Sequence, residues 1–418
     1  MAKAARGNAV VGQSGGSTAV INQSLVGVIE AVDDCAAIGR LLGAHHGVRG
    51  IVQELFVDLK GFDRERLERV AATPCAALGS TRDKPNEEYC RRIFEVFRKN
   101  DVRYFFYIGG NDSADTARIV REMAKADSYD LRVFHIPKTI DNDLRVTDHC
   151  PGYGSAARFV ALAVMGDDRD NASLTGLKID VIMGRDAGWL TAASMLARSD
   201  ESTGPHLIYV PEAIFDIGRF VDDVRAVYDR LGRCVIAVSE GIVCDEKMEV
   251  RKADGSVKLV DKPIAVKVAE EMHIDLERDD HGNVVLSKLP LGQFLADYIA
   301  ERLGKNKPRI RADTFGYVQR SFPGCVSPVD AREARLVGRR AVQYALAGRT
   351  SGSVAIRRNE GARYGVSYFR AELADVAHQT KPLPKEYINA AANGINDSFL
   401  DYVAPLAGDL PPIGRLFD

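Results

Sequence analysis

The chain has 418 residues, a formal net charge of −2 and 46% hydrophobic residues. These values describe a globular chain of two or three domains with enough apolar residues for a large core. The near-neutral charge and the lack of a dense Lys/Arg block argue against a nucleic-acid or membrane partner, which usually needs a basic excess, and favour a small-molecule ligand.

The first residues contain no long apolar segment before the first predicted strand, and no apolar run is long enough to span a bilayer. We therefore expect a cytoplasmic protein. The seven cysteines form an odd set without CxxC spacing, which argues against both a disulfide framework and a zinc site. We expect them to be reduced structural thiols.

Short apolar runs recur along the chain, and nearly every one ends in Gly, Ser, Asp or Glu. In chain order they are NAVVGQSGG, VRYFFYIGGND, LRVFHIPKTIDND, LKIDVIMGRDAG, HLIYVPE and RCVIAVSEG. Helical patterns lie between them, with apolar residues three and four apart in residues 116–126 and 219–232. This alternation predicts an α/β fold with a parallel sheet covered on both faces. Such sheets bind ligands beyond the carboxyl ends of their strands.

A glycine- and serine-bearing stretch at residues 150–159 follows the first group of strands, and we expect a domain change near it. Residues 245–310 differ from the rest of the chain. The segment MEVRKADGSVKLV alternates around Asp254 and Gly255 as a β-hairpin does, and the residues after it are charged and helical. We interpret residues 245–310 as an insertion.

The segment GQSGG, at residues 12–16, matches the GxSxG pattern in which Ser14 would be a hydrolase nucleophile. That nucleophile takes part of its oxyanion hole from a loop upstream, whereas this motif follows the first strand, so a hydrolase is disfavoured. Alternatively, Gly15 and Gly16 let the backbone approach another group closely. The sequence contains no GxxxxGK[ST], no HExxH and no GxGxxG after a strand.

The segment GGNDSADT, at residues 109–116, joins an aromatic strand to a predicted helix. In a purely structural interpretation the glycines form the turn, and Asp112 or Ser113 caps the helix. A helix start with bare amides is also an anion site, and phosphate is its commonest occupant. Asp112 would repel a phosphate unless a cation intervenes or the acid serves to exclude one.

The segment IPKTIDND, at residues 136–143, crowds Lys138, Asp141 and Asp143 at one strand end. These charges could simply pair with one another. A carboxylate beside a lysine is also what phosphoryl transfer to a hydroxyl requires, because the carboxylate accepts the leaving proton and the lysine stabilises the transferred group. Further polar residues follow or end apolar runs, and these are Arg82, Arg185, Glu240, Arg311, Tyr317 and Arg320.

Together, several motifs resemble the 6-phosphofructokinase family in order and approximate spacing over most of residues 8–330. They are QSGGSTAVIN, LGSTR, GGNDS, PKTIDND, MGRDAGW, SEG and RADTFGYVQR. The resemblance implies two Rossmann-like three-layer αβα domains with the active site in the cleft between them. It also implies a reversible phosphoryl transfer to the 1-hydroxyl of fructose 6-phosphate, with Mg²⁺ as cofactor, in a homodimer or homotetramer.

The resemblance also implies how the chain is divided. Residues 1–152, with a return segment at about 324–380, would form the phosphoryl-donor domain. Residues 153–323, including the insertion, would form the fructose 6-phosphate domain, and residues 381–418 a C-terminal extension. The chain would thus cross between the domains more than once.

Roles for individual residues follow from the resemblance as well. Asp141 would accept the proton of the sugar hydroxyl, while Arg82 and Arg185 would steady the transferred phosphoryl group. Arg311 would reach in from a neighbouring subunit. The diphosphate site would comprise Gly15, Gly16, Arg82, Gly110, Ser113 and Lys138. The sugar-phosphate site would comprise Thr139, Ile140, Asp141, Asp143, Met183, Gly184, Arg185, Glu240, Arg311, Tyr317, Val318, Gln319 and Arg320.

Several positions depart from the family's ATP users in the direction of its pyrophosphate-dependent branch. ATP users have Gly-Gly-Asp-Gly-Ser where this chain has GGNDS, a glycine in place of Lys138, and usually a histidine in place of Tyr317. They also often have an arginine near Gly176, where this chain has none. Asn111 replaces an acid that commonly helps to hold Mg²⁺, although an amide oxygen can contact the ion or its water shell. We therefore expect diphosphate to be the donor, with Lys138 binding it and Asp112 excluding the longer ATP.

Two other functional classes remain open, an ATP-dependent sugar-phosphate kinase and a non-catalytic sugar-phosphate-binding regulatory subunit. A donor assay would reveal the first. The second is disfavoured because Lys138, Asp141 and Arg185 are all present. The sequence also leaves open whether sedoheptulose 7-phosphate is an equal acceptor.

Overall fold

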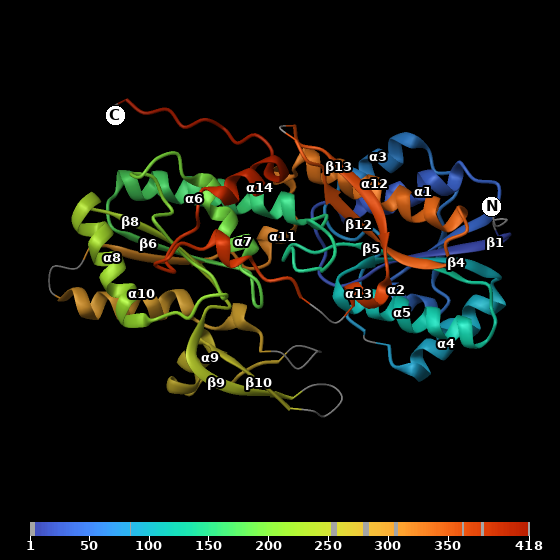
Figure 1. Cartoon of the computed structure of the whole chain (residues 1–418), viewed down its shortest axis with the longest axis horizontal. Helices are drawn as coiled ribbons and strands as arrows, with labels where there is room; N and C mark the ends of the chain where they lie inside the picture. The colour runs from blue at the N-terminus through green and yellow to red at the C-terminus, as the bar shows by residue number, and fades with distance from the viewer. Residues whose placement is uncertain are drawn as a thin grey trace. The chain divides into compact units, whose positions relative to one another are not determined.

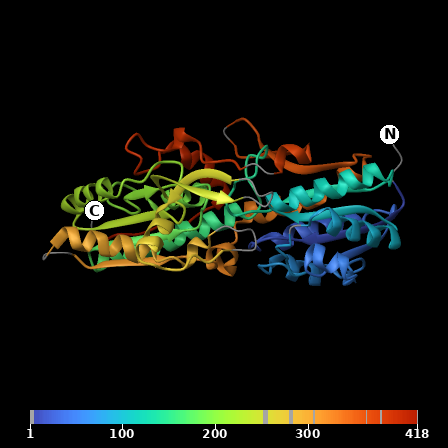
Figure 2. The same cartoon turned by 90° about the horizontal axis from the view of Figure 1, so that it is seen from below.

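The computed structural model describes residues 5–83, 85–251, 257–278, 284–304, 308–361, 363–377 and 380–416. The chain divides into two compact units. Unit 1 comprises Met1–Ala156 and Arg320–Lys381, and unit 2 comprises Ala157–Gln319 and Pro382–Asp418. The colours in Figures 1 and 2 show how the chain is shared: unit 1 combines blue and teal segments with darker orange ones, and unit 2 combines green, yellow and light orange segments with red ones.

Unit 1 is built on a seven-stranded sheet in the order β13-β12-β5-β4-β1-β2-β3. The edge strands β3 and β13 run antiparallel to their neighbours, and the strands between them are parallel. The strands are β1 (Gly7–Gln13), β2 (Ile38–Ala44), β3 (Phe56–Asp58), β4 (Val102–Gly109), β5 (Arg132–Pro137), β12 (Ser351–Arg358) and β13 (Val366–Ala371).

Helices cover both faces of this sheet (Figure 1). One face carries α1 (Ile21–Asp33), α3 (Arg64–Ala72) and α12 (Pro328–Leu346), and the other carries α2 (Gly47–Val52), α4 (Glu87–Lys99), α5 (Asn111–Ala126) and α13 (Leu373–Val376). In β4, Tyr104 and Phe106 pack into the first core, whereas Phe105 and Tyr107 pack into the second. Because successive strand residues face opposite sides, a continuous aromatic run fits a central strand of a three-layer domain.

Unit 2 contains a four-stranded parallel sheet in the order β11-β6-β8-β7 and a separate two-stranded sheet of β9 and β10. The strands are β6 (Leu177–Ile182), β7 (Leu207–Tyr209), β8 (Cys234–Ser239), β9 (Val243–Arg251), β10 (Val257–Pro263) and β11 (Ile310–Thr314). The helices are α6 (Tyr153–Ser173), α7 (Trp189–Ala192), α8 (Ile217–Leu231), α9 (Ile264–Glu271), α10 (Leu291–Leu303), α11 (Val318–Ser321) and α14 (Ser398–Ala407). Two of them are shared with unit 1, because α6 begins there and the last residues of α11 belong to it.

Short 3-10 helices complete the described secondary structure of both units, and they are η1 (Ala193–Ala197), η2 (Leu286–Lys288), η4 (Pro323–Cys325) and η5 (Lys385–Tyr387). The C-terminal residues pack into unit 2. There the Trp189 ring lies 5.1 Å from the Tyr402 ring and 6.3 Å from the Phe399 ring, between ring centroids.

The sequence patterns agree with these elements. The α/β class and the parallel sheets are confirmed, and the two predicted helices are found as α5 and α8. The hairpin is confirmed for its paired strands, in which Val257 lies opposite Arg251. Its turn residues, Asp254 and Gly255, lie outside the described residues.

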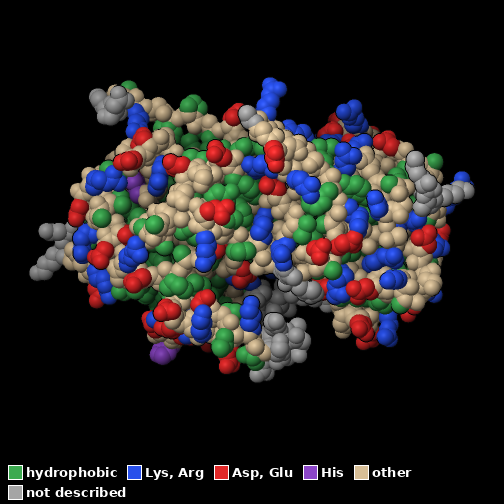
Figure 3. All heavy atoms as spheres, in the orientation of Figure 1, with side chains coloured by type: hydrophobic (Ala, Val, Ile, Leu, Met, Phe, Trp, Pro, Cys, Tyr) green, Lys and Arg blue, Asp and Glu red, His purple; other side chains and the backbone are tan. Residues whose placement is uncertain are grey.

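Figure 3 shows acidic and basic side chains mixed over the face in view, in keeping with a net charge of −2. Within the described part of the chain, none of the helices is long and apolar enough to cross a bilayer. All seven cysteines are free, as expected, and Cys75 is the exposed one.

The contact between α1 and α12 is exceptionally close. A Cβ added to Gly27 on α1 would lie 2.1 Å from the Arg335 carbonyl oxygen, and one added to Gly338 on α12 would lie 2.1 Å from the Ser24 carbonyl oxygen. Both atoms are backbone, so neither can move aside cheaply. The glycines therefore let the two helix backbones approach one another.

We predict that Gly27→Ala lowers the stability of unit 1 by about 1–3 kcal/mol, the usual cost of overpacking a core. Gly166→Ala is the matched control, because Gly166 is exposed on α6 with nothing within 4 Å of an added Cβ. That control should be neutral or should gain up to about 1 kcal/mol from better helix propensity. The measurement is the midpoint of thermal unfolding, and equal midpoints for both variants would contradict the close approach.

Candidate active site

The loops after three neighbouring parallel strands begin at one edge of the unit 1 sheet. Gln13 of β1 pairs with Ile108 of β4, and Gly109 of β4 pairs with Pro137 of β5. Beyond the strands, the Lys138 amide donates to the Gly109 carbonyl oxygen at 2.9 Å. The motifs QSGG, GGNDS and PKTIDND are therefore neighbours in space, as the strand ends predicted.

Gly15 and Gly16 lie directly against two cationic side chains. Gly15 has a left-handed φ of 76°, and a Cβ added to it would lie 3.1 Å from Lys138 Nζ. A Cβ added to Gly16 would lie 2.4 Å from Arg320 Nη1, and the Gly16 carbonyl oxygen accepts a hydrogen bond from Lys138 Nζ at 2.7 Å. The glycines are thus needed for the close approach of both cations.

The LGSTR segment is joined to this glycine turn by its backbone. The Gly15 amide donates to the Thr81 carbonyl oxygen at 2.9 Å, and the Ser80 hydroxyl donates to the Gly15 carbonyl oxygen at 2.6 Å. Arg82 follows Thr81 directly and is exposed. A third predicted cation is thereby brought to the same edge.

Lys138 is buried, with 4% of its surface exposed. Burial, together with the charges of Arg320 and Arg82, lowers the pKa of its ammonium to about 8, and Asp141 and Asp143 partly oppose this shift. The charged form is therefore less favourable here than in water. An anionic ligand placed beside the ammonium would be attracted to it and would raise its pKa again.

The start of helix α5 differs from the purely structural interpretation of GGNDS, in which Asp112 or Ser113 would cap the helix. Gly110 is the N-cap residue and the helix begins at Asn111, so Asp112 lies in the first turn and is not the cap. Ser113 is not the cap either, and its hydroxyl donates to the Ser14 hydroxyl at 2.8 Å. Ser14 thus contacts a hydroxyl rather than the imidazole that a hydrolase nucleophile would need.

The first residues after β5 carry the two predicted carboxylates, Asp141 and Asp143. The Asp141 amide donates to the Thr139 hydroxyl at 3.0 Å, while Ile140 between them is buried. The Asn111 amide nitrogen donates to an Asp143 carboxylate oxygen at 3.3 Å. The other atom of that amide, Asn111 Oδ1, is buried without a hydrogen-bond partner among the described residues.

In unit 2, the predicted sugar-phosphate residues gather at the carboxyl ends of β6 and β8. Ile182 pairs with Ser239, and the Glu240 amide donates to the Ile182 carbonyl oxygen at 2.8 Å. The Ser239 hydroxyl donates to the Gly184 carbonyl oxygen at 2.6 Å. Met183, Gly184 and Glu240 are therefore brought together.

The residues after β11 join this group. The Met183 amide donates to the Gln319 side-chain oxygen at 3.3 Å. Tyr317 and Val318 are exposed, at 51% and 56% of their surface. A Cβ on Gly241 would lie 2.1 Å from the Arg185 carbonyl oxygen, so this turn also packs tightly.

Two predicted sugar-phosphate residues lie apart from that group. Arg311 pairs with Lys178 near the beginning of β6, whereas Met183 follows its end. Arg320 belongs to unit 1, where its carbonyl oxygen accepts from the Ala19 amide at 2.9 Å. The structure thus places Arg320 beside the glycine turn after β1.

An acidic cluster that the sequence analysis did not single out lies in unit 2. Oxygens of Asp167 on α6, Asp180 on β6 and Asp313 on β11 all lie within 4.8 Å of one another. The Lys178 ammonium stands among them, bonded to Asp313, 3.2 Å from Asp167 and 3.7 Å from Asp180. This lysine already supplies a positive charge to the three carboxylates. The acidic cluster belongs to unit 2, whereas the predicted Mg²⁺ position at Asn111 belongs to unit 1.

Comparison with known proteins identifies the family. The family described as Phosphofructokinase matches residues 8–345. The chain belongs to this family. Among curated relatives of this phosphofructokinase, the pyrophosphate–fructose 6-phosphate 1-phosphotransferase of Rhodospirillum rubrum is 51% identical over 415 residues, covering 99% of this chain and 97% of the relative. The Halomonas elongata protein of the same name is 37% identical, covering 98% and 94%.

A solved structure agrees. The pyrophosphate-dependent phosphofructokinase of Nitrosospira multiformis matches with a TM-score of 0.82 and 33% identity, covering 99% of this chain and 95% of that one. This phosphofructokinase family membership establishes the two-domain α/β fold that the motifs implied. The roles of individual residues remain predictions.

Sequence reasoning missed a buried polar network in unit 1. His149 lies between the carboxylates of Asp148 and Glu333, and Tyr364 donates to Glu333. Asp148 and His149 are adjacent polar residues before Pro151, which is a weak signal. Glu333 lies 184 residues further on, so no local pattern could have joined it to His149.

We predict that catalytic efficiency at limiting diphosphate falls as the pH rises through about 8, because Lys138 loses its proton there and no longer attracts the anion. The matched variant is Lys138→Arg, whose guanidinium stays charged. Diphosphate itself also ionises in this range, but that effect is common to both proteins. The measurement is kcat/KM for diphosphate between about pH 6.5 and 9.5. If kcat/KM falls at the same alkaline pH in the wild type and in Lys138→Arg, the titration of Lys138 is not the cause of that fall.

Proposed function

We propose that this phosphofructokinase moves a phosphoryl group from diphosphate to the 1-hydroxyl of fructose 6-phosphate, reversibly, giving fructose 1,6-bisphosphate and phosphate. The observation that carries the donor assignment is the buried Lys138 ammonium, which reaches the glycine turn after β1. ATP users of the family have a glycine in place of this lysine. The printed names of the relatives from Rhodospirillum rubrum and Halomonas elongata support the same donor and acceptor.

In the proposed donor site, diphosphate lies against Gly15, Gly16 and the start of α5. Lys138 and Arg82 would meet its oxygens, because phosphoryl transfer depends mainly on alignment and charge stabilisation. Asp112, in the first turn of α5, would stand where a longer donor must pass. Its charge would repel the additional phosphate of ATP.

In the proposed transfer, the sugar O1 forms a bond to phosphorus while the bond from that phosphorus to the bridging oxygen breaks. The bridging oxygen leaves as part of phosphate, and Asp141 accepts the hydroxyl proton. The bond from its own amide to Thr139 fixes the backbone at Asp141.

Metal binding is proposed on one observation of this structure. Asn111 Oδ1 is a buried oxygen without a hydrogen-bond partner among the described residues, and it lies on an amide bonded to the Asp143 carboxylate. Hard cations such as Mg²⁺ prefer oxygen ligands and retain several waters. Asn111 and Asp143 would hold the ion, which when bound neutralises phosphate charge.

The acceptor would be bound by the unit 2 group of Met183, Gly184 and Glu240 together with Gln319, Tyr317 and Val318. Arg185 would steady the transferred group. Arg320, placed beside Gly16, would contact a phosphate from unit 1. Arg311 lies apart from these residues, and its proposed contact requires a neighbouring subunit. The homodimer or homotetramer and the cytoplasmic location remain predictions.

A panel of donors and acceptors tests the function directly. Purified protein is offered fructose 6-phosphate or sedoheptulose 7-phosphate, each with diphosphate or ATP and Mg²⁺, and the bisphosphate product is measured. We expect turnover with fructose 6-phosphate and diphosphate, and the reverse reaction with phosphate. Turnover with ATP alone would make the chain an ATP-dependent kinase, and sugar-phosphate binding without turnover would make it a regulatory subunit.

We predict that Asp141→Asn lowers kcat by about 10²–10⁴-fold, because the proton acceptor is lost, while fructose 6-phosphate binding is largely kept. The second quantity is measured separately as the dissociation constant of fructose 6-phosphate by calorimetry. Near-normal turnover in this variant would remove Asp141 from the mechanism.

Donor choice is tested by the ratio of kcat/KM for ATP and diphosphate. We predict that Lys138→Gly lowers diphosphate turnover by about 10²-fold without creating ATP activity, because Asp112 still obstructs the longer donor. Asp112→Gly should admit ATP, and the double variant should shift the ratio furthest.

The control for donor choice is Asp115→Asn, an acid one turn further along α5 that is bonded to Arg118. It should leave the ratio unchanged. If the ratio is the same in all of these variants and the wild type, the donor assignment of Asp112 and Lys138 is wrong.

A further inference from the structure

The loop of residues 138–152 connects β5 to α6 and carries Asp141. Its two arms are joined at the base, where the Thr139 amide donates to the Pro151 carbonyl oxygen at 3.2 Å. A second cross-link lies next to the proposed base. The side-chain oxygen of Asn142, which is fully buried, accepts from the Cys150 amide at 3.0 Å. The position of Asp141 therefore depends on the returning arm of the loop.

The tip of this loop is held by two further elements of unit 1. The Asp148 amide donates to the Ile356 carbonyl oxygen of β12 at 2.9 Å, and the Ile356 amide donates to the Thr147 hydroxyl at 3.0 Å. The Lys381 amide donates to the Asp143 carbonyl oxygen at 2.6 Å, and its ammonium donates to the carbonyl oxygens of Thr147 and Asp148.

These contacts hold a backbone conformation that is unfavourable by itself. Val146, at the tip, has a φ of 71°, in the left-handed region that β-branched residues rarely adopt. Such a residue costs on the order of 1–3 kcal/mol and persists only where its surroundings fix it. Its side chain is 44% exposed, so its own packing can offset only part of this cost. Contacts of the flanking residues must offset the rest.

His149 is the most deeply buried charged group among these flanking residues, with 3% of its surface exposed. Its Nδ1 lies 2.7 Å from the Asp148 carboxylate, and its Nε2 lies 2.6 Å from the Glu333 carboxylate of α12. A neutral imidazole can donate from only one nitrogen, so two carboxylate partners favour the imidazolium. These carboxylates raise the pKa of His149 in spite of its burial.

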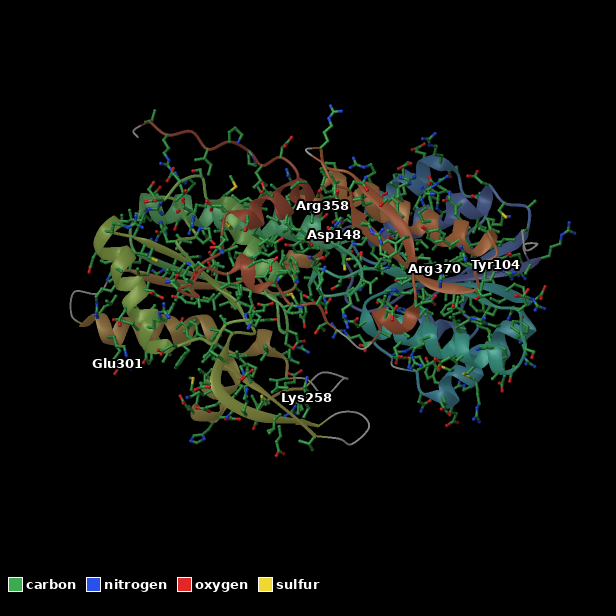
Figure 4. All side chains as sticks on the ribbon, viewed as in Figure 1. Tyr104, Asp148, Lys258, Glu301, Arg358 and Arg370 are labelled. Atoms are coloured by element: carbon green, nitrogen blue, oxygen red, sulfur yellow. The ribbon has the colours of Figure 1, made fainter. Side chains whose placement is uncertain are left out.

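Both carboxylates have a second partner, which fixes their positions in turn. The Tyr364 hydroxyl donates to Glu333 at 2.7 Å, and Arg358 Nε lies 3.5 Å from Asp148. Figure 4 labels Asp148 and Arg358, which come from the loop and from the end of β12 and lie near one another. The imidazolium thus ties the loop to α12 through groups that are themselves held.

We propose that His149 is a positioning residue for phosphoryl transfer, holding the loop so that Asp141 stays aligned with the sugar hydroxyl. This rests on the function proposed above. The physical path is short: His149 precedes Cys150, the Cys150 amide is bonded to Asn142, and Asn142 follows Asp141. A shift of the imidazolium is passed through one peptide unit and one buried hydrogen bond to the base.

A double-mutant cycle tests this role. His149→Gln is made in the wild type and in the Asp141→Asn variant, and kcat and both KM values are measured with the donor that the wild type uses. In the wild type we expect kcat to fall about tenfold or more, with each KM changed by less than about threefold. In the Asp141→Asn background we expect kcat to change by less than about threefold, because the group being positioned is already absent.

His206→Gln is the matched control, since His206 is a half-buried histidine of unit 2 whose ring accepts from the Val235 amide. It should leave kcat near the wild-type value. Glu333→Gln is the second test variant, because it keeps an oxygen for Nε2, removes the charge and replaces the oxygen that Tyr364 contacts with an amide nitrogen. It should show the same non-additive pattern with a smaller fall, and it decides the question if His149→Gln does not fold.

The outcomes separate the two proposals. Whether diphosphate or ATP is the donor is judged on the wild type, and if the donor is ATP the cycle is carried out with ATP. An unchanged kcat in His149→Gln, or an equal fall in both backgrounds, would overturn the positioning role. So would a wild type that transfers no phosphoryl group from either donor.

Discussion

The parallel pairing of β1, β4 and β5 is the constraint on which the candidate active site depends. Because Gln13 lies beside Ile108 and Gly109 lies beside Pro137, the three loops that follow begin at one edge of the sheet. The aromatic residues of β4 fill both cores, and helices cover both faces of the sheet. The charged groups of the candidate site therefore lie beyond the strand ends, where they need not be buried between layers.

The parts of the site that directly follow a strand could be predicted from the sequence. Continuous apolar runs indicate strands buried on both faces, and the first polar residues after them must lie at the sheet edge. Lys138 follows β5 in this way, as Met183 follows β6 and Glu240 follows β8. Their placement requires no knowledge of long-range contacts, since strand direction alone brings them to the edge.

The parts that depend on distant residues could not be predicted. Both Gly110 and Asp112 are acceptable cap residues, and only the structure shows that the helix begins at Asn111. Arg320 lies beside Gly16, which is about three hundred residues earlier in the chain. The motif RADTFGYVQR, which ends at Arg320, had suggested only a contact with the sugar phosphate. The bond between His149 and Glu333 likewise spans 184 residues. Local propensity reports on neither pairing, because both are set by how α11 and α12 return to unit 1.

Two buried lysines show how electrostatics separates a binding group from a structural one. Lys178 stands among three carboxylates, which raise its pKa despite desolvation. Its charge is already compensated, so an anionic ligand would gain little by approaching it. Lys138 donates to a carbonyl oxygen and has arginines nearby, and its pKa is lowered to about 8. Holding that charge costs free energy until an anion arrives, and the cost is then returned as binding. The same residue type therefore stabilises the fold at one strand, whereas at the other it has the electrostatics expected of the phosphate-binding role proposed for it.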